Sequence, residues 1–213
     1  MSTFDFTKIK DFDKHIEMSI PNYDGLANVF RQLANHYSDP STLVLDIGCS
    51  TGKFLGSLER KDDMGLVGID IVDIVDINNH ILYEENEARD ALEDHLDVDI
   101  VSVVISMFTL QFMSRNERKD TLEQMRKAVA NGAVVLVAEK ICMDDATLQT
   151  EMLQMHMEEK RKNFTDKQIL DKNAELSNSM RCVTEAQLLQ ELYKIGLPTR
   201  VWQSYNFVGY IIK

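Results

Sequence analysis

Short apolar runs alternate with longer stretches of helical periodicity, and this alternation constrains the fold more than any other feature of the chain. Runs rich in Val, Ile and Leu cover residues 43–47, 66–69, 81–83, 100–105 and 133–137. Near-continuous runs of this kind are typical of parallel strands that are covered on both faces. Helical patterns cover residues 53–60, 116–130 and 144–180. This order predicts a doubly wound α/β sheet with helices on both faces.

The end of the chain departs from the parallel pattern. Residues 200–213 read as two extended segments that lie close enough in sequence to pair antiparallel, after a helix over 184–195 that stops at Gly196. We therefore expect a mostly parallel sheet that ends in an antiparallel hairpin. Only residues 71–79 separate the second apolar run from the third. Because a crossover with its helix takes about 10–12 residues, we expect a vestigial helix there.

Length and charge limit the function classes. A chain of 213 residues fits one domain, and its net charge of -12 offers no general attraction to nucleic acid or to an anionic membrane surface. The three cysteines form no CxxC pair, so neither a disulfide framework nor a metal site is indicated. No apolar run approaches the roughly 18 residues of a membrane span. We expect a soluble, cytoplasmic protein that acts on a small-molecule substrate.

The strongest local signal is Asp46-Ile47-Gly48-Cys49-Ser50-Thr51-Gly52, at the end of the first predicted strand. Gly48 allows the chain to reverse sharply, and Gly52 allows the following backbone to approach a ligand without a Cβ in the way. Amides at the start of the next helix favour an anionic group such as a carboxylate. Asp70 ends the second predicted strand. An acid in that position typically accepts hydrogen bonds from ribose hydroxyls.

Two common nucleotide motifs are excluded. A dinucleotide fingerprint needs GxGxxG, and Ser50 stands where the second glycine would be. A phosphate-binding P-loop needs Ser or Thr after its lysine, and Phe54 stands there. A ligand with a ribose and a carboxylate but no phosphates remains, and S-adenosylmethionine has that composition. The alternative is that Gly48 and Gly52 only shape a tight turn.

With these residues, the chain resembles the class I S-adenosylmethionine-dependent methyltransferases, and among them the carboxy-S-adenosylmethionine synthases of tRNA wobble-uridine modification. Residues 46–50 are similar to the DLGCS loop of that family, and residues 19–23 to its SVPGY segment. Residues 108–112 are identical to its FTLQF segment. The family order is also repeated at residues 11–12, 139–140, 155–156, 160–161, 202 and 206–207. The resemblance implies a Rossmann-like class I methyltransferase sheet and a homodimer.

The resemblance also implies the ligand, which is S-adenosylmethionine or its product S-adenosylhomocysteine. We expect the cofactor-binding residues to be Tyr23, Asp46, Gly48, Cys49, Ser50, Gly52, Asp70, Ile71, Asn86, Glu87 and Met107. Within this set the glycine loop, residues 48–52, holds the amino-acid part, Asp70 holds the ribose, and Asn86 with Glu87 holds the adenine. We expect an N-terminal helical segment over 1–40, a cofactor-binding core over 41–140, a helical lid over 141–183, and the last helix with the hairpin over 184–213.

Departures from the family touch the site. Met107 stands where the family has an asparagine that contacts the cofactor, and gap-free counting places Ala174 where the family has the arginine that grips the extra carboxylate. Lys172 or Arg181 could replace its charge, although a lysine does not reproduce a guanidinium fork. These departures favour methyl transfer to a small-molecule acceptor. The alternatives are carboxy-S-adenosylmethionine synthesis and a non-catalytic protein that binds the cofactor.

The sequence identifies no catalytic base, and the candidates are Tyr23 and His156. Tyr23 is a candidate through the resemblance. His156 follows a stripe of Leu and Met at helical spacing, which is more often core or dimer surface than a ligand site. The run Lys160-Arg161-Lys162 follows two glutamates and predicts a solvated helix face. Transfer from a sulfonium depends chiefly on alignment, so a missing base excludes nothing.

Overall fold

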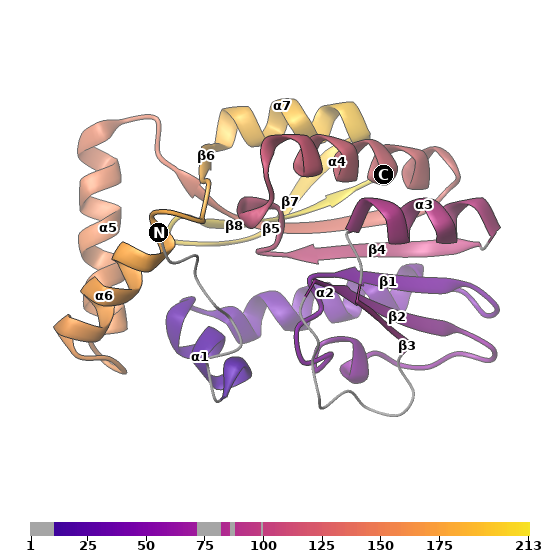
Figure 1. The fold of residues 1–213 in the computed structure, drawn as a ribbon, viewed down its shortest axis with the longest axis horizontal. Helices are drawn as coiled ribbons and strands as arrows, with labels where there is room; N and C mark the ends of the chain where they lie inside the picture. Colours follow the sequence, from indigo (N-terminus) through magenta and orange to yellow (C-terminus); the bar gives the residue numbers. More distant parts are fainter. Residues whose placement is uncertain (1–10, 72–81, 86–87, 99) are drawn as a thin grey trace.

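The computed structural model describes residues 11–71, 82–85, 88–98 and 100–213, and a mixed sheet runs through the middle of them (Figure 1). Its strands are β1 (Leu43–Ile47), β2 (Gly65–Asp70), β3 (Leu82–Glu85), β4 (Val101–Met107), β5 (Val134–Cys142), β6 (Val183–Thr184), β7 (Pro198–Ser204) and β8 (Phe207–Ile212). The order is β3-β2-β1-β4-β5-β8-β7, and β6 pairs with β5 off this path. The first five strands in that order are parallel, whereas β8 runs antiparallel to both β5 and β7.

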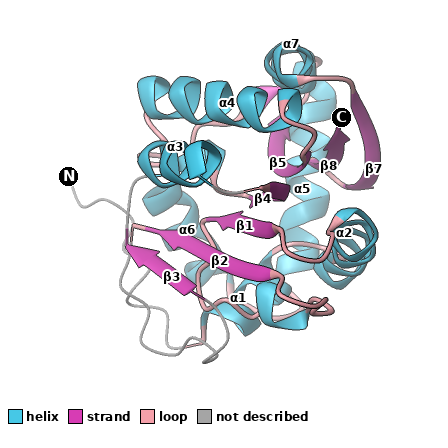
Figure 2. Cartoon of the chain, turned by 90° about the vertical axis from the view of Figure 1, so that its right-hand side faces the viewer, coloured by secondary structure: helices cyan, strands magenta, loops and turns pink. Residues whose placement is uncertain are grey.

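Helices cover both faces of this sheet. Figure 2 shows α3 (Ala88–Val98), α4 (Arg115–Ala130) and α7 (Glu185–Ile195) on one face and α2 (Tyr23–Tyr37) on the other. The short α1 (Phe12–Ser19) precedes α2, while α5 (Ala146–Lys160) and α6 (Asp166–Leu176) project beyond one end of the sheet (Figure 1). None of the described helices is both long and apolar enough to cross a membrane.

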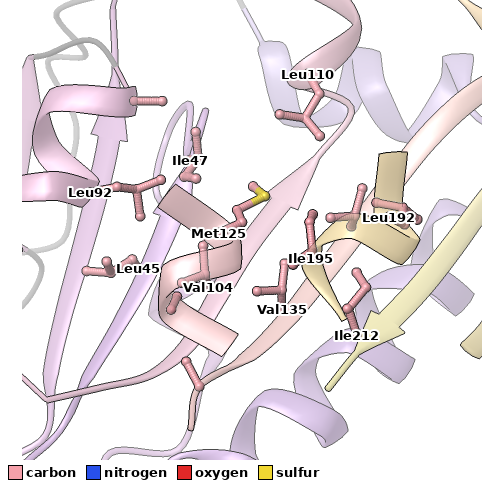
Figure 3. Close-up of a cluster of buried hydrophobic side chains, with 14 of the residues drawn as sticks. Leu45, Ile47, Leu92, Val104, Leu110, Met125, Val135, Leu192, Ile195 and Ile212 are labelled. Carbon is pink, nitrogen blue, oxygen red and sulfur yellow. The ribbon is translucent and has the colours of Figure 1, made fainter. Parts of the chain in front are cut away.

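Each face of the sheet has its own apolar core. On the first face, one apolar cluster joins Leu45 and Val104 of the strands with Met125 of α4 and Leu192 of α7 (Figure 3). On the second face α2 packs so closely on β8 that a Cβ on Gly209 would lie 3.0 Å from Leu26 Cδ1. Glycine at that position therefore lets the helix seat on the strand.

The α/β class and the closing antiparallel hairpin are confirmed, but two helix predictions were wrong. The pattern over 53–60 forms only a 3-10 turn, η2 (Leu55–Ser57), because Gly56 disfavours a helix and breaks it. The stretch over 144–180 is two helices, since Thr165 caps the start of α6 in a reciprocal pair with Gln168. The sequence reading also missed α3. The vestigial helix expected over residues 71–79 lies, apart from Ile71, outside the described residues.

Candidate functional site

The glycine loop turns back on itself directly after β1. Gly48, Ser50 and Gly52 have φ values of 75°, 47° and 69°, so left-handed residues alternate along the loop. A Cβ on Gly48 would lie 2.1 Å from Thr109 Oγ1, which makes glycine necessary there on packing grounds as well. Because η2 has only three residues, it supplies no helix dipole. The amide of Gly52 donates back to the carbonyl of Cys49 at 2.9 Å, which closes the turn.

Asp70, at the end of β2, is bonded to this loop. Its Oδ2 accepts a hydrogen bond of 3.0 Å from the backbone amide of Ser50. The amide of Gly48 donates to the carbonyl of Ile69 at 2.7 Å, so the loop is joined to β2 at two points. The structure thus brings together Gly48, Ser50 and Asp70, which the sequence reading assigned to one ligand.

Asp46 lies in β1 directly before the loop, and its charge acts on Tyr23 at the start of α2. Asp46 is buried, and burial together with the nearby charge of Asp70 raises its pKa to about 7. Tyr23 begins α2, and burial together with the charge of Asp46 raises the pKa of its phenol. The Tyr23 ring centroid lies 6.5 Å from that of Phe108, which follows β4. The two predicted residues therefore share one buried acidic environment.

A cavity of about 290 Å³ opens beside the loop. Its lining is Ile47, Gly48, Ile69, Asp70, Ile71, Ala88, Thr109, Phe112, Met113, Asn116, Glu117, Asp120 and Thr121. Apolar side chains near β1 and β2, together with Asp70 at the end of a parallel strand, fit an adenosine group, and α4 adds the polar Asn116, Glu117, Asp120 and Thr121 on the opposite wall. The residues from α4 were not predicted, because no local motif marks the helix face that turns toward β1.

Two other predicted cofactor residues, Met107 and Cys49, do not line the cavity. Met107 ends β4 and packs half-buried on the second core. Cys49 is buried so close to β2 that a Cβ on Gly68 would lie 2.7 Å from its Sγ, and burial raises the pKa of its thiol. Cys49 therefore packs against β2 as a small apolar side chain. Asn86 and Glu87 lie outside the described residues.

His156 is a buried contact of α5 with the N-terminal helices. Its Nε2 lies 3.0 Å from the carbonyl oxygen of Ser19, so this nitrogen donates and the other ring nitrogen carries no proton. Burial lowers the pKa of His156 to about 4. The ring is therefore neutral near pH 7. Its centroid lies 5.2 Å from that of Phe207, which in turn lies 5.7 Å from that of Phe108.

Three half-buried lysines lie near these rings, and the sequence reading did not predict them as a group. The lysine cluster consists of Lys140 on β5, Lys160 on α5 and Lys172 on α6. Burial, followed by the charges of Lys140 and Lys172, lowers the pKa of Lys160 to about 8. The pKa of Lys172 is also lowered to about 8 by burial. The Nζ of Lys140 lies 5.6 Å from the centroid of Phe207.

The two suggested substitutes for the missing arginine lie in different places. Arg181 donates from Nη1 to the carbonyl of Met113 at 3.2 Å, which puts it beside the cavity. Lys172 instead lies near Lys160 and His15, since both charges act on the imidazole of His15. Ala174 is exposed on α6. No group of three potential metal-binding side chains occurs among the described residues.

Comparisons with known proteins agree with this geometry. No family model matches the chain. A carboxy-S-adenosyl-L-methionine synthase of Shigella boydii is 30% identical over 217 residues, which cover 96% of this chain and 88% of that protein. Another of that name, from Hydrogenovibrio crunogenus, is 27% identical over 219 residues, with coverage of 98% and 87%.

The solved structures that resemble this chain are more distant in sequence. An O-methyltransferase family protein from Burkholderia thailandensis has a TM-score of 0.61 at 13% identity and covers 98% of this chain and 61% of that one. A SAM-dependent methyltransferase from Anabaena variabilis has a TM-score of 0.60 at 13% identity, with coverage of 90% and 85%. These matches confirm the expected class I methyltransferase fold.

Proposed function

The chain belongs to the carboxy-S-adenosyl-L-methionine synthase family, and on this premise we propose that it is an S-adenosylmethionine-dependent transferase that moves the methyl group to a small-molecule acceptor. The observation that carries the proposal is the bond from the Ser50 amide to Asp70 Oδ2, because it joins the glycine loop and the ribose-binding acid in one crevice. The bound cofactor would supply an electrophilic methyl group on a sulfonium.

The residues of the crevice divide the work of binding. The turn at the glycine loop lets the backbone approach the amino-acid part of the cofactor without a Cβ in the way, while the amides of Gly48, Ser50 and Gly52 keep their bonds within the protein. Asp70 accepts hydrogen bonds from the ribose hydroxyls, since a carboxylate can take several donors besides the Ser50 amide. The apolar walls with Ile69 and Ile71 hold the base. Tyr23 and Phe108 close the side toward the acceptor, where they exclude water and fix the line of attack.

Calorimetric titration with S-adenosylmethionine tests this proposal. We expect a clear heat with the unaltered chain and binding weaker by about 1–3 kcal/mol in Asp70→Ala, the cost of removing a buried hydrogen-bond partner. Asp144→Ala, at an exposed position before α5, is the matched control and should bind as the unaltered chain does. Absence of heat in the unaltered chain, with no cofactor already bound, would contradict the proposal.

Synthesis of carboxy-S-adenosylmethionine is the second candidate, and the name of the relatives favours it. Met107 and the exposed Ala174 weigh against it, since both replace side chains that the family resemblance assigns to the ligand. Mass spectrometry of the ligand released from purified protein separates the two: a carboxylated cofactor supports this candidate, and unmodified or demethylated cofactor supports methyl transfer. Tight retention without acceptor-dependent turnover would indicate a binding protein instead.

We also propose that the chain works in the cytoplasm as a homodimer, as the family resemblance implies. Leu148 and Met155, seven residues apart on the same side of α5, each expose 43% of their surface, and a second copy could cover them. Light scattering on the purified chain measures the mass in solution. A monomer at micromolar concentration would contradict the homodimer.

A further inference from the structure

Helix α1 packs only lightly on the rest of the chain. None of its eight residues, all of which the structure describes, is buried, although the half-buried Ile16 contacts the second core. Its start is capped by the side chain of Asp11, which accepts a hydrogen bond of 3.1 Å from the backbone amide of Lys14. A helix of this length is unstable in water on its own. The contacts that α1 makes with other elements therefore decide how often it stays in position.

On one side, α1 contacts the glycine loop and the residue after it through two acidic side chains. Thr51 donates from Oγ1 to Asp13 Oδ1 at 2.8 Å, and Lys53 Nζ lies 2.8 Å from Glu17 Oε1. The two carboxylates are four residues apart and so share one face of the helix. The side chains of Lys53 and Glu17 are 60% and 39% exposed, and water screens such an ion pair. The half-buried bond between Asp13 and Thr51 is therefore the stronger link to the loop.

On its other side, α1 contacts the helical insert that consists of α5 and α6. The His15 ring centroid lies 5.4 Å from that of Phe164, in the segment between those two helices. The carbonyl oxygen of Ser19, the last residue of α1, lies 3.0 Å from Nε2 of His156 on α5. Figure 1 shows α1 at the end of the sheet from which α5 and α6 project. Helix α1 thus connects the glycine loop with this insert.

The connection between α1 and α2 can act as a hinge. Residues 20–22 form it, and Asn22 is left-handed with a φ of 59°. A few residues at the end of an element usually absorb the backbone change in a hinge motion. Tyr23, which we expect to contact the cofactor, begins α2 directly after this connection, and the charges of Asp13 and Glu17 act on its phenol. A rotation at the hinge would therefore move α1 away from both Tyr23 and the glycine loop.

We propose that α1 is a latch on the cofactor crevice, and that Asp13 and Thr51 are its positioning pair. Their bond breaks when the cofactor enters or leaves and forms again when the crevice closes. The inference rests on the proposed function for the identity of the ligand. Neither side chain is among the expected cofactor contacts, and Asp13 acts through Thr51. Because Thr51 follows Ser50, whose amide is bonded to Asp70, the closed latch holds the backbone that carries this bond.

Surface plasmon resonance on the immobilised full chain, with S-adenosylmethionine as the probe, measures both rate constants of binding. Thr51→Val removes the hydroxyl donor and keeps the shape, Asp13→Ala removes the acceptor, and Thr51→Ser is the rescue that keeps the hydroxyl. Lys14→Ala, at an exposed position of α1, is the matched control. We expect Thr51→Val and Asp13→Ala to raise kon and koff together by about fivefold, the population change that one lost hydrogen bond produces. Thr51→Ser and Lys14→Ala should keep the rates of the unaltered chain.

Hydrogen exchange tests the latch without a ligand. The amides of α1 should exchange about fivefold faster in Thr51→Val because α1 opens more often, whereas those of α4 keep their rates and control for folding. Unchanged exchange in α1, or a rise of koff without a rise of kon, overturns the latch. If the double variant of Asp13→Ala with Thr51→Val changes the rates by the product of the two single changes, the two residues do not act as a pair and the assignment is overturned. Faster exchange in α1 of Thr51→Val, with no binding of S-adenosylmethionine to the unaltered chain, counts against the proposed function alone.

Discussion

The carboxylate of Asp70 accepts a hydrogen bond of 3.0 Å from the backbone amide of Ser50, and this contact fixes the glycine loop to the end of β2. Thr109 also contacts the chain at the start of the loop, where its Oγ1 donates to the carbonyl of Ile47 at 3.0 Å. The shape of the loop is therefore set by β2 and by the segment after β4 together. Substitutions in the loop should affect both the stability of the fold and the binding of the cofactor.

Gly48→Ala should destabilise the chain more than an ordinary left-handed glycine would. Its Cβ would lie 2.1 Å from Thr109 Oγ1 at a φ of 75°, so backbone strain and overpacking add to about 2–4 kcal/mol. Urea denaturation measures the loss. Gly132→Ala is the control, because its φ is 99° and no atom lies within 4 Å of the added Cβ. It should lose only about 1–2 kcal/mol. Equal losses would mean that Thr109 moves aside freely.

The glycine loop and Asp70 could be predicted because their signals are local: a strand pattern, two glycines and an acid at the next strand end. The lysine cluster could not. Lys160 lies in a run with Arg161 and Lys162 that predicts a solvated face, and the structure confirms this for the other two, which pair with Asp166 at 2.7 Å and Glu159 at 2.6 Å. Lys160 alone turns inward. Its neighbours are Lys140 of β5 and Lys172 of α6, and the sequence pattern did not separate α6 from α5.

Helix boundaries could also be predicted where a local signal sets them, and not where a tertiary contact does. The α4 prediction over 116–130 was close to the observed Arg115–Ala130, since a reciprocal Ser114 and Glu117 cap marks its start in the sequence. The helix predicted over 53–60 is absent partly because of a tertiary contact. The backbone amide of Glu59 donates to Asn35 Oδ1 at 3.0 Å, so this segment is bonded to α2 instead of forming its own helix.

The stability of the chain should rise with pH through the range in which Lys160 loses its proton. The pKa of Lys160 in the folded chain is about 8, whereas an unfolded lysine titrates near 10.4, so between these values the unfolded chain binds more protons. Deprotonation therefore favours folding from about pH 8 upward. The charges of Lys140 and Lys172 act on Lys160, and the charge of Lys160 acts in turn on His15 and His156.

To isolate this effect, the free energy of unfolding of the unaltered chain is compared with that of Lys160→Met, by urea denaturation from pH 7 to 10. The advantage of the methionine variant should shrink as the pH rises. A constant difference across that range would show that the lysine has an ordinary pKa in the folded chain.

His156→Phe should remove an acid-sensitive contribution to the stability of the chain. The pKa of the folded imidazole is about 4 and the unfolded one is near 6.5, so stability falls as the pH drops from about 6.5 toward 4, where the unfolded chain binds the extra proton. The variant should lose about 1–3 kcal/mol at pH 7, because the Ser19 carbonyl is left without its donor. Its unfolding free energy should then change less than that of the unaltered chain over this acidic range.

Arg118→Leu should destabilise the chain by about 3–5 kcal/mol, because it leaves the buried carboxylate of Glu139 without its cation. Glu139 is 1% exposed, and its Oε1 already accepts no hydrogen bond from a described residue. Burial, only partly opposed by Arg118, raises the pKa of Glu139 to about 7. The double variant Arg118→Leu with Glu139→Gln should recover part of the loss, since an amide carries no charge to bury. Urea denaturation of the two single variants and the double variant gives the coupling energy between Arg118 and Glu139. If the double variant loses as much stability as the two single variants together, the ion pair is not what stabilises this side of β5.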